Sequence, residues 1–161
     1  MKVKTKHLVT GALIAAMYVV LTLIANALGL ASNPVQVRLS EALTILPVFT
    51  PAAIPGLFIG CLLANYITGC AVWDIIFGSL ATLLGAIGTY YLKKNKYLAA
   101  ASPILANTII VPFILQYVYQ FEGGIGYFFL TVGAGEIISA GVLGLLLHQA
   151  IVRTKISDML E

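Results

Sequence analysis

The chain has 161 residues, of which 60% are hydrophobic and only 9% are charged. A soluble globular domain carries about 25% charged residues, so this composition excludes an ordinary water-soluble protein. It also excludes a disordered chain, which needs low hydrophobicity and high net charge. The remaining class is an integral membrane protein, and the length predicts a single transmembrane domain over residues 1–161. The net charge of +3 does not indicate nucleic-acid binding, because the basic residues stand in small clusters.

Most of the chain divides into apolar runs that predict membrane-spanning helices. A helix needs roughly 20 residues to cross the hydrocarbon core. The long runs cover residues 7–30, 51–68, 72–92, 97–120 and 125–152. A shorter run at 38–50 lies between the first two. It reaches roughly 18 Å at about 1.5 Å per residue, less than the ~30 Å core.

The basic residues decide whether the short run is a further crossing. All of them except Arg38 form three clusters, which precede the first run, follow the run at 72–92 and follow the last run: Lys2, Lys4 and Lys6; Lys93, Lys94 and Lys96; Arg153 and Lys155. Positive residues favour the cytoplasmic side, so an even number of crossings must separate the first two clusters. Three long runs lie between them, and the short run must be the fourth crossing. The sequence therefore predicts an all-α, polytopic membrane protein with six transmembrane helices and both termini cytoplasmic.

The start of the chain has an alternative interpretation. Its lysines, the first apolar run and Ala25-Asn26-Ala27 together imitate a signal peptide with an A-x-A cleavage site. We favour the transmembrane interpretation, because the run is long for a signal peptide and five further spans follow it.

Ionisable residues at membrane depth cost about 2.5–3.5 kcal/mol each and mark function by default. Such residues are few here and fall mostly in the outer half: Arg38, Glu41, Asp74 and Glu136, with Asn65 and Asn107 as neutral companions. A pocket that opens outward needs polar groups at one end, whereas a channel or proton relay needs them along the whole path. The short run also indicates a binding site, because a short span exposes backbone groups inside the bilayer.

Most of these residues have a simpler explanation as well. Arg38 can snorkel to lipid headgroups, or it can pair with Glu41 at the i, i+3 spacing. Asp74 can be favoured by the helix dipole at the start of its span. Asn65 can bridge two helices. The simple explanation is weakest for Glu136, which lies about halfway along the last run.

Four sequence blocks resemble the QueT family: Gln36-Val-Arg-Leu-Ser-Glu-Ala-Leu-Thr-Ile-Leu-Pro47, Gly60-Cys-Leu-Leu-Ala-Asn65, Asp74-Ile-Ile-Phe-Gly-Ser-Leu-Ala-Thr82 and Gly135-Glu-Ile-Ile-Ser139. That family comprises substrate-binding S components of energy-coupling factor (ECF) transporters, assigned to queuosine precursors. The resemblance covers nearly the whole chain. It implies six helices and a partner module with one transmembrane coupling protein and two cytoplasmic ATPases. The chain itself has no P-loop with which to hydrolyse ATP.

The resemblance also implies a docking motif and a substrate. Ala12-xxx-Ala16 matches the Ala-rich motif by which S components dock on the coupling protein. A queuosine precursor such as preQ1 or queuine is a 7-deazaguanine, whose pyrimidine edge offers two adjacent donors for a carboxylate and a carbonyl for an amide. An aminomethyl group on the ligand would want a second carboxylate, and the flat ring suits aromatic stacking.

The expected binding residues therefore comprise three carboxylates, two amides, a guanidinium that orients an acid and an indole ring: Glu41, Asp74 and Glu136; Asn65 and Gln36; Arg38; Trp73. The indole could instead belong to an aromatic belt at the membrane interface. We expect a multi-pass protein of a prokaryotic cell membrane, surrounded by lipid.

Other functions also fit parts of the sequence. An S component for another vitamin-like molecule would differ only in the ligand it retains. A self-sufficient carrier is less favoured, since no clear repeat and no cytoplasmic polar path are present. An intramembrane enzyme would need a nucleophile–base pair or a metal cluster at depth. The two histidines, His7 and His148, lie at cytoplasmic helix ends, and Cys61 and Cys70 lack a metal-binding spacing. We therefore expect no enzyme activity, no cofactor and no metal.

Overall fold

The computed structural model describes residues 2–30, 35–154 and 156, and the regular structure in these residues is entirely helical. The elements in chain order are α1 (Lys2–Ala27), η1 (Leu39–Val48), α2 (Ala53–Ile67), α3 (Val72–Tyr91), α4 (Lys96–Tyr117), α5 (Ile125–Glu136), η2 (Ile137–Leu143) and α6 (Gly144–Thr154). The last three follow one another without a break and make one long helix, with η2 as a π-helical stretch inside it. The all-α prediction is confirmed.

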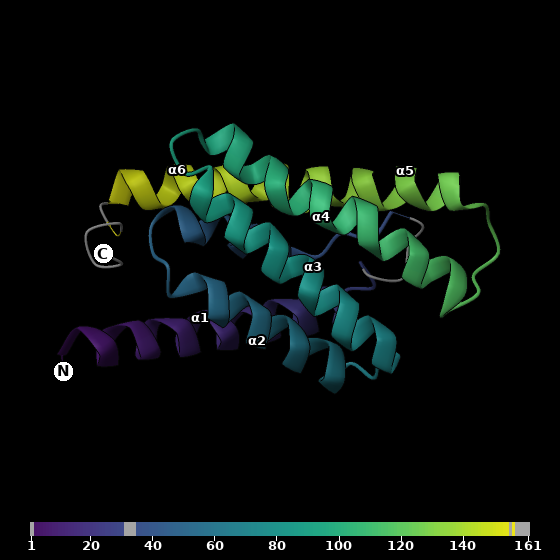
Figure 1. The fold of residues 1–161 in the computed structure, drawn as a ribbon, viewed down its shortest axis with the longest axis horizontal. Coiled ribbons are helices and arrows are strands. Elements are labelled where there is room, and N and C mark those ends of the chain that lie inside the picture. Colours follow the sequence, from purple (N-terminus) through teal and green to yellow (C-terminus); the bar gives the residue numbers. More distant parts are fainter. Residues whose placement is uncertain (1, 31–34, 155, 157–161) are drawn as a thin grey trace.

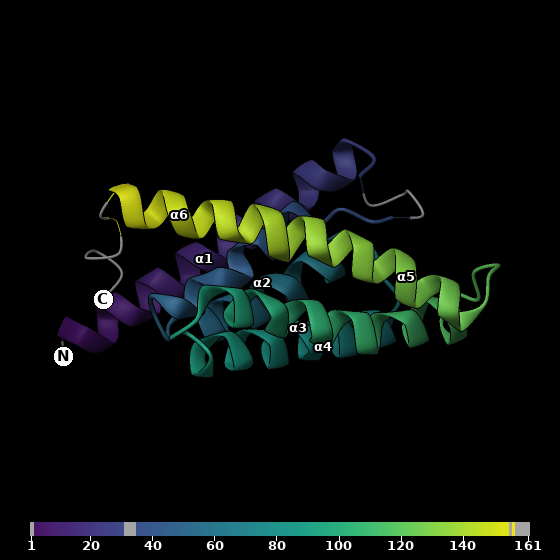
Figure 2. The ribbon, with the colours of Figure 1, turned by 90° about the horizontal axis from the view of Figure 1, so that it is seen from above.

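The helices match the apolar runs of the sequence closely. Within the described residues, four helices are long and apolar enough to cross a membrane: Thr5–Ala27, Val72–Tyr91, Lys96–Tyr117 and Ile125–Thr154. Leu39–Val48 and Ala53–Ile67 are apolar but shorter. In Figures 1 and 2, α1 lies beside α2, and α3 lies beside α4, as their extensive packing requires. That the two short helices also cross the membrane stays a prediction.

The two ends of the bundle differ in charge. The start of α1, the turn between α3 and α4, and the end of α6 all lie at the same end (Figure 1). Basic residues from all three sequence clusters belong to these segments, namely Lys6, Lys93, Lys94, Lys96 and Arg153. Lys155 lies outside the described residues. This arrangement is the one that an even number of crossings between clusters requires, and the cytoplasmic orientation of this end stays a prediction.

The short helix η1 is enclosed by its neighbours. It is a 3₁₀-helix that packs against α1, α3, η2 and α6, and seven of its ten residues are buried. Irregular backbone is tolerated at membrane depth where protein, not lipid, surrounds it. This enclosure explains how a run that contains Glu41 and Pro47 can lie inside an apolar bundle. The Thr44 hydroxyl also donates to the Glu41 carbonyl oxygen at 2.6 Å.

Small residues allow α1 and α2 to approach closely. A Cβ atom built on Gly56 would lie 2.6 Å from the Gly11 carbonyl oxygen, and one built on Gly60 would lie 2.8 Å from the Cβ of Tyr18. Such contact of backbones is the usual consequence of small residues at four-residue spacing in membrane helices. The Gly11 and Ala15 face of α1 is therefore occupied by α2 within the monomer.

We expect Gly56→Ala to lower the free energy of unfolding by about 1–3 kcal/mol, the range for overpacking a tight contact. The added methyl group would have to push the α1 backbone away. Thermal unfolding in detergent measures the effect. Gly126→Ala is the matched control, because a Cβ atom at that position of α5 meets nothing within 4 Å. Equal unfolding temperatures for the two variants would contradict the close packing.

Candidate functional site: a polar cavity at one end of the bundle

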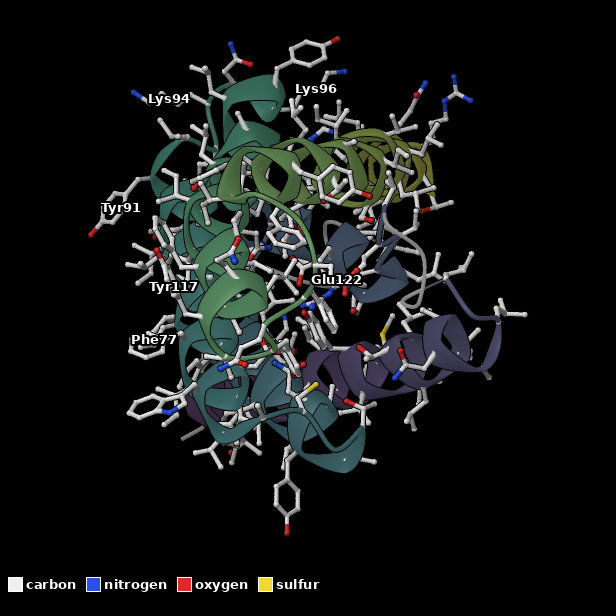
Figure 3. The ribbon with its side chains drawn as sticks, turned by 90° about the vertical axis from the view of Figure 1, so that its right-hand side faces the viewer. Phe77, Tyr91, Lys94, Lys96, Tyr117 and Glu122 are labelled. Atoms are coloured by element: carbon white, nitrogen blue, oxygen red, sulfur yellow. The ribbon has the colours of Figure 1, made fainter. Side chains whose placement is uncertain are left out.

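A cavity of about 350 Å³ lies at the end of the bundle opposite the start of α1 and the end of α6. The C-terminal turns of α1, the segment before η1, the end of α2, the start of α3 and the chain that leaves α4 all contribute to its walls. Figure 3 views the molecule from this end, where the loop that carries Glu122 passes in front of the middle of the bundle. The alternating direction of successive helices brings these distant sequence segments together.

Four of the residues predicted to bind ligand line this cavity: Gln36, Arg38, Asn65 and Asp74. Asn65 and Asp74 each keep only 5% of their surface exposed, so their polar groups belong to the cavity wall and not to the outer surface. The structure thus gathers residues from three separate sequence blocks at one site. Their contact with a ligand stays a prediction.

Asp74 lies in the first turn of α3 and is held by Tyr119. The Tyr119 hydroxyl donates to Asp74 Oδ2 at 2.8 Å, and the main-chain N–H of Ala71 donates to the Tyr119 oxygen at 3.1 Å. Asp74 Oδ1 is buried and has no hydrogen-bond partner among the described residues. A Cβ atom on Gly78 would lie 2.9 Å from Oδ1, so glycine at this position makes room for the carboxylate.

Asn65 connects α2 with α3 beside the same carboxylate. Its Nδ2 lies 3.5 Å from the Asp74 carbonyl oxygen and 3.7 Å from Cys61 Sγ. These long contacts agree with the helix-bridging role that the sequence also allowed. Because Asn65 lines the cavity as well, it can serve both purposes.

Arg38 stands at the end of an extended segment that lies against the last long helix. A Cβ atom on Gly135 would lie 2.1 Å from the Gln36 carbonyl oxygen, so glycine is required for this approach. The main-chain N–H of Arg38 donates to Ser139 Oγ at 3.0 Å. The guanidinium interacts electrostatically with the carboxylates of Asp74 and Glu41. This position fits a cation that orients acids.

Glu41 and Glu136 lie deeper than the cavity wall. Glu41 is fully buried, and its two carboxylate oxygens accept hydrogen bonds from the Tyr18 hydroxyl and from Asn107 Nδ2, the latter at 3.3 Å. Glu136 is 6% exposed and interacts electrostatically with Glu41, and its Oε2 has no partner among the described residues. Tyr18 lines the cavity, and its hydroxyl contacts Glu41. Direct contact of either glutamate with a ligand stays a prediction.

Trp73 is placed away from the cavity lining. Its side chain is 58% exposed on the flank of α3 and stacks on Phe77, with ring centroids 5.9 Å apart. Together with Tyr117 these rings border a shallow apolar groove between α3 and α4. Figure 3 shows Phe77 and Tyr117 on one side of the bundle. This placement agrees with the aromatic belt that was the alternative role for Trp73.

Comparison with known proteins decides the family. A family model described as "QueT transporter" matches residues 8–153. The chain belongs to the QueT transporter family. It is also similar to "Queuosine precursor transporter QueT" from Lactococcus lactis subsp. cremoris, with 37% identity over 83 residues. These residues are 52% of this chain and 48% of the relative, so the match spans about half of the relative's length. No solved structure matches the chain.

Membership of this family bears on two predictions. The matched family is one of transporters, which agrees with the expectation of a transport protein and not of an enzyme. Its apolar helices and its family together identify it as a multi-pass membrane protein. The resemblance drawn from the four sequence blocks is confirmed as well.

Sequence reasoning missed the aromatic residues of the cavity. Tyr18, Tyr119 and Phe121 line it, and the rings of Tyr119 and Phe121 stack with centroids 5.4 Å apart. The available signal was a pair of aromatic residues, Tyr119 and Phe121, at the end of the predicted run 97–120. Hydropathy alone does not distinguish Tyr119, which lines the cavity, from Tyr117, which borders the groove between α3 and α4.

Proposed function

We propose that this protein is the substrate-binding (S) component of an ECF transporter and that it captures a queuosine precursor of the 7-deazaguanine type. The observation that carries the proposal is the cavity, which places the Asp74 carboxylate and the Asn65 amide in one wall of a QueT family member. The name of the Lactococcus relative supports the same class of substrate.

The chemistry of the cavity suits this substrate. The Asp74 carboxylate can accept hydrogen bonds from the two adjacent N–H donors of a 7-deazaguanine. The carbonyl group of the ligand can accept from Asn65 or Gln36. Arg38 lines the same cavity and interacts electrostatically with Asp74. A volume of about 350 Å³ lies at the lower end of the range for small-molecule sites, roughly 300–1,000 Å³, which suits a compact bicyclic ligand.

The interior below the cavity favours an S component over a self-sufficient carrier. Beyond the buried Glu41 and Glu136, the interior next to Tyr18 is an apolar core that includes Ile14, Leu46 and Leu57. A polar substrate has no favourable route through such a core without a large rearrangement. A partner that drives this rearrangement with ATP is therefore expected, and the chain has no P-loop of its own.

A groove of about 390 Å³ along α1 and α2 has the shape to bind a helix of the coupling protein. Ala12 and Ala16 are exposed in this groove, whereas Gly11 and Ala15 on the neighbouring face are buried against α2. Small exposed residues at a four-residue spacing permit close approach of another helix in lipid. We assign this groove to the transmembrane coupling protein, which would join the chain to two cytoplasmic ATPases.

Removal of the charge on Asp74 tests the ligand site. We expect Asp74→Asn to weaken binding of preQ1 by roughly 1.5–3 kcal/mol, the range for a hydrogen bond to a charged group. Isothermal titration of the purified protein measures the affinity. Glu122→Gln is the matched control, because it makes the same chemical change in an exposed loop at the same end of the bundle. Unchanged affinity in Asp74→Asn would refute the assignment of this wall.

Reconstitution tests the transport mechanism. The purified chain alone should bind ligand in liposomes without accumulating it, and uptake should require ATP together with the coupling protein and the ATPases. Uptake by the chain alone would favour the carrier. Copurification of a different vitamin-like molecule would favour an S component with another substrate.

A further inference from the structure

We propose that Tyr119 recognises the ligand jointly with Asp74, and that their oxygens form an acceptor-only edge that selects two adjacent N–H donors. The proposal rests on the proposed function in one respect, since it takes the cavity as the ligand site. It goes further by naming a second recognition residue and the feature of the ligand that the pair reads.

The hydrogen bonds of Tyr119 leave it only acceptor capacity. A phenol oxygen has one proton to donate and two lone pairs. The proton is donated to Asp74 Oδ2 at 2.8 Å, and one lone pair accepts from the Ala71 N–H at 3.1 Å. Burial raises the pKa of the Tyr119 hydroxyl, so the proton stays in place. One lone pair remains for a ligand.

Asp74 contributes the second acceptor of the edge. Its Oδ1 faces Gly78, and Asp74 lines the cavity. We take Oδ2, the oxygen that Tyr119 also contacts, as the one that reads the ligand. Oδ2 already accepts from Tyr119 and keeps further acceptor capacity, because an ionised carboxylate offers about four lone-pair positions. The two acceptor oxygens are 2.8 Å apart in a wall of the cavity.

Tyr119 is held rigidly enough to act in recognition. Its main-chain N–H donates to the Ile114 carbonyl oxygen at 3.1 Å, and the Phe121 N–H donates to Leu115 at 3.2 Å. Between them Gln120 adopts a left-handed conformation, with φ at +52°. The Phe121 ring stacks on Tyr119. A site whose donors and acceptors are already in position loses less entropy on binding and discriminates better.

An acceptor-only edge favours ligands that present two adjacent N–H donors. A 2-amino-4-oxopyrimidine ring presents a ring N–H next to an exocyclic amine, which are two adjacent donors. Loss of the amine leaves one buried acceptor without a partner, and sites that hydrogen-bond a substrate group reject analogues that lack it. The pair should therefore distinguish a 7-deazaguanine from its analogue without the 2-amino group.

The test compares these two ligands in two single variants. The probes are 7-aminomethyl-7-deazaguanine and the same molecule without its 2-amino group, titrated into wild-type protein, Tyr119→Phe and Tyr117→Phe. We expect Tyr119→Phe to lose about tenfold in affinity for the amino ligand and less than about threefold for the analogue. Tyr117→Phe should bind both ligands as the wild type does, because Tyr117 is 71% exposed and borders the groove between α3 and α4.

Several outcomes would overturn the proposal. Equal losses for both ligands would show that Tyr119 only supports the fold, and no loss for either would show that it takes no part. In an Asp74→Asn background, Tyr119→Phe should cost less than about threefold, since the pair is already broken, and a full tenfold loss there would also refute it. Wild-type protein that binds neither ligand would instead refute the proposed function, and this pairing with it.

Discussion

Leucine in place of Ala12 or Ala16 should reduce ATP-driven uptake to background while ligand affinity of the isolated protein stays within about twofold. Both alanines are exposed in the groove along α1 and α2, so a larger side chain can be accommodated in the monomer. The same side chain would hold a partner helix away from the groove. The cavity is lined by later turns of α1, and substitutions at well-separated sites seldom couple by more than about 0.5 kcal/mol.

Two measurements on each variant decide this prediction: titration of the isolated protein with ligand, and pull-down of the coupling protein. Leu13→Phe is the matched control, because Leu13 is next to Ala12, is 60% exposed and lies outside the residues that border the groove. The control should keep both ligand binding and pull-down. Lost ligand binding with intact pull-down in Ala12→Leu would mean that the motif serves packing in the monomer.

The sequence was sufficient to predict which residues lie at which end of the bundle. Helix direction alternates along the chain, so the position of a residue within its run determines its depth. That rule brought Arg38, Asn65 and Asp74 to the end opposite the basic clusters, and the structure places all three around one cavity. Depth could be predicted because it depends on chain connectivity and charge alone.

Rotation of each helix about its axis was harder to predict. Trp73 and Asp74 are neighbours in the sequence, yet Asp74 lines the cavity and Trp73 is exposed on the flank. About 100° of rotation separates adjacent residues of a helix. In a soluble protein the polar face would reveal the rotation, but here lipid and core are both apolar. The hydropathy pattern therefore carries little information on which face of α3 turns inward.

The complete burial of Glu41 was also difficult to predict from the sequence. The local sequence does not indicate that η1 is a 3₁₀-helix enclosed by α1, α3 and the last long helix. That enclosure makes Glu41 a fully buried partner of Tyr18 and Asn107. Its hydrogen-bond partners are 23 and 66 residues away in the chain, so no local sequence motif predicts them.

Glu41→Leu should lower the free energy of unfolding by about 2–6 kcal/mol. The glutamate accepts hydrogen bonds from Tyr18 and Asn107, and leucine would leave both buried donors without a partner. Each such group costs about 1–3 kcal/mol. Arg38 would also lose one of the two carboxylates with which it interacts electrostatically. A denaturant titration in detergent measures the change.

A second substitution separates the hydrogen-bond network from simple packing. Tyr18→Phe removes the hydroxyl that Glu41→Leu would leave without an acceptor, while it keeps the ring that packs in the core. Replacement of both partners of a buried hydrogen bond by apolar groups can be nearly neutral, whereas replacement of the acceptor alone is not. The double variant should therefore be more stable than the sum of the two single losses implies, by about 1 kcal/mol or more. Strictly additive losses would show that the hydrogen bond to Glu41 does not hold Tyr18 in place.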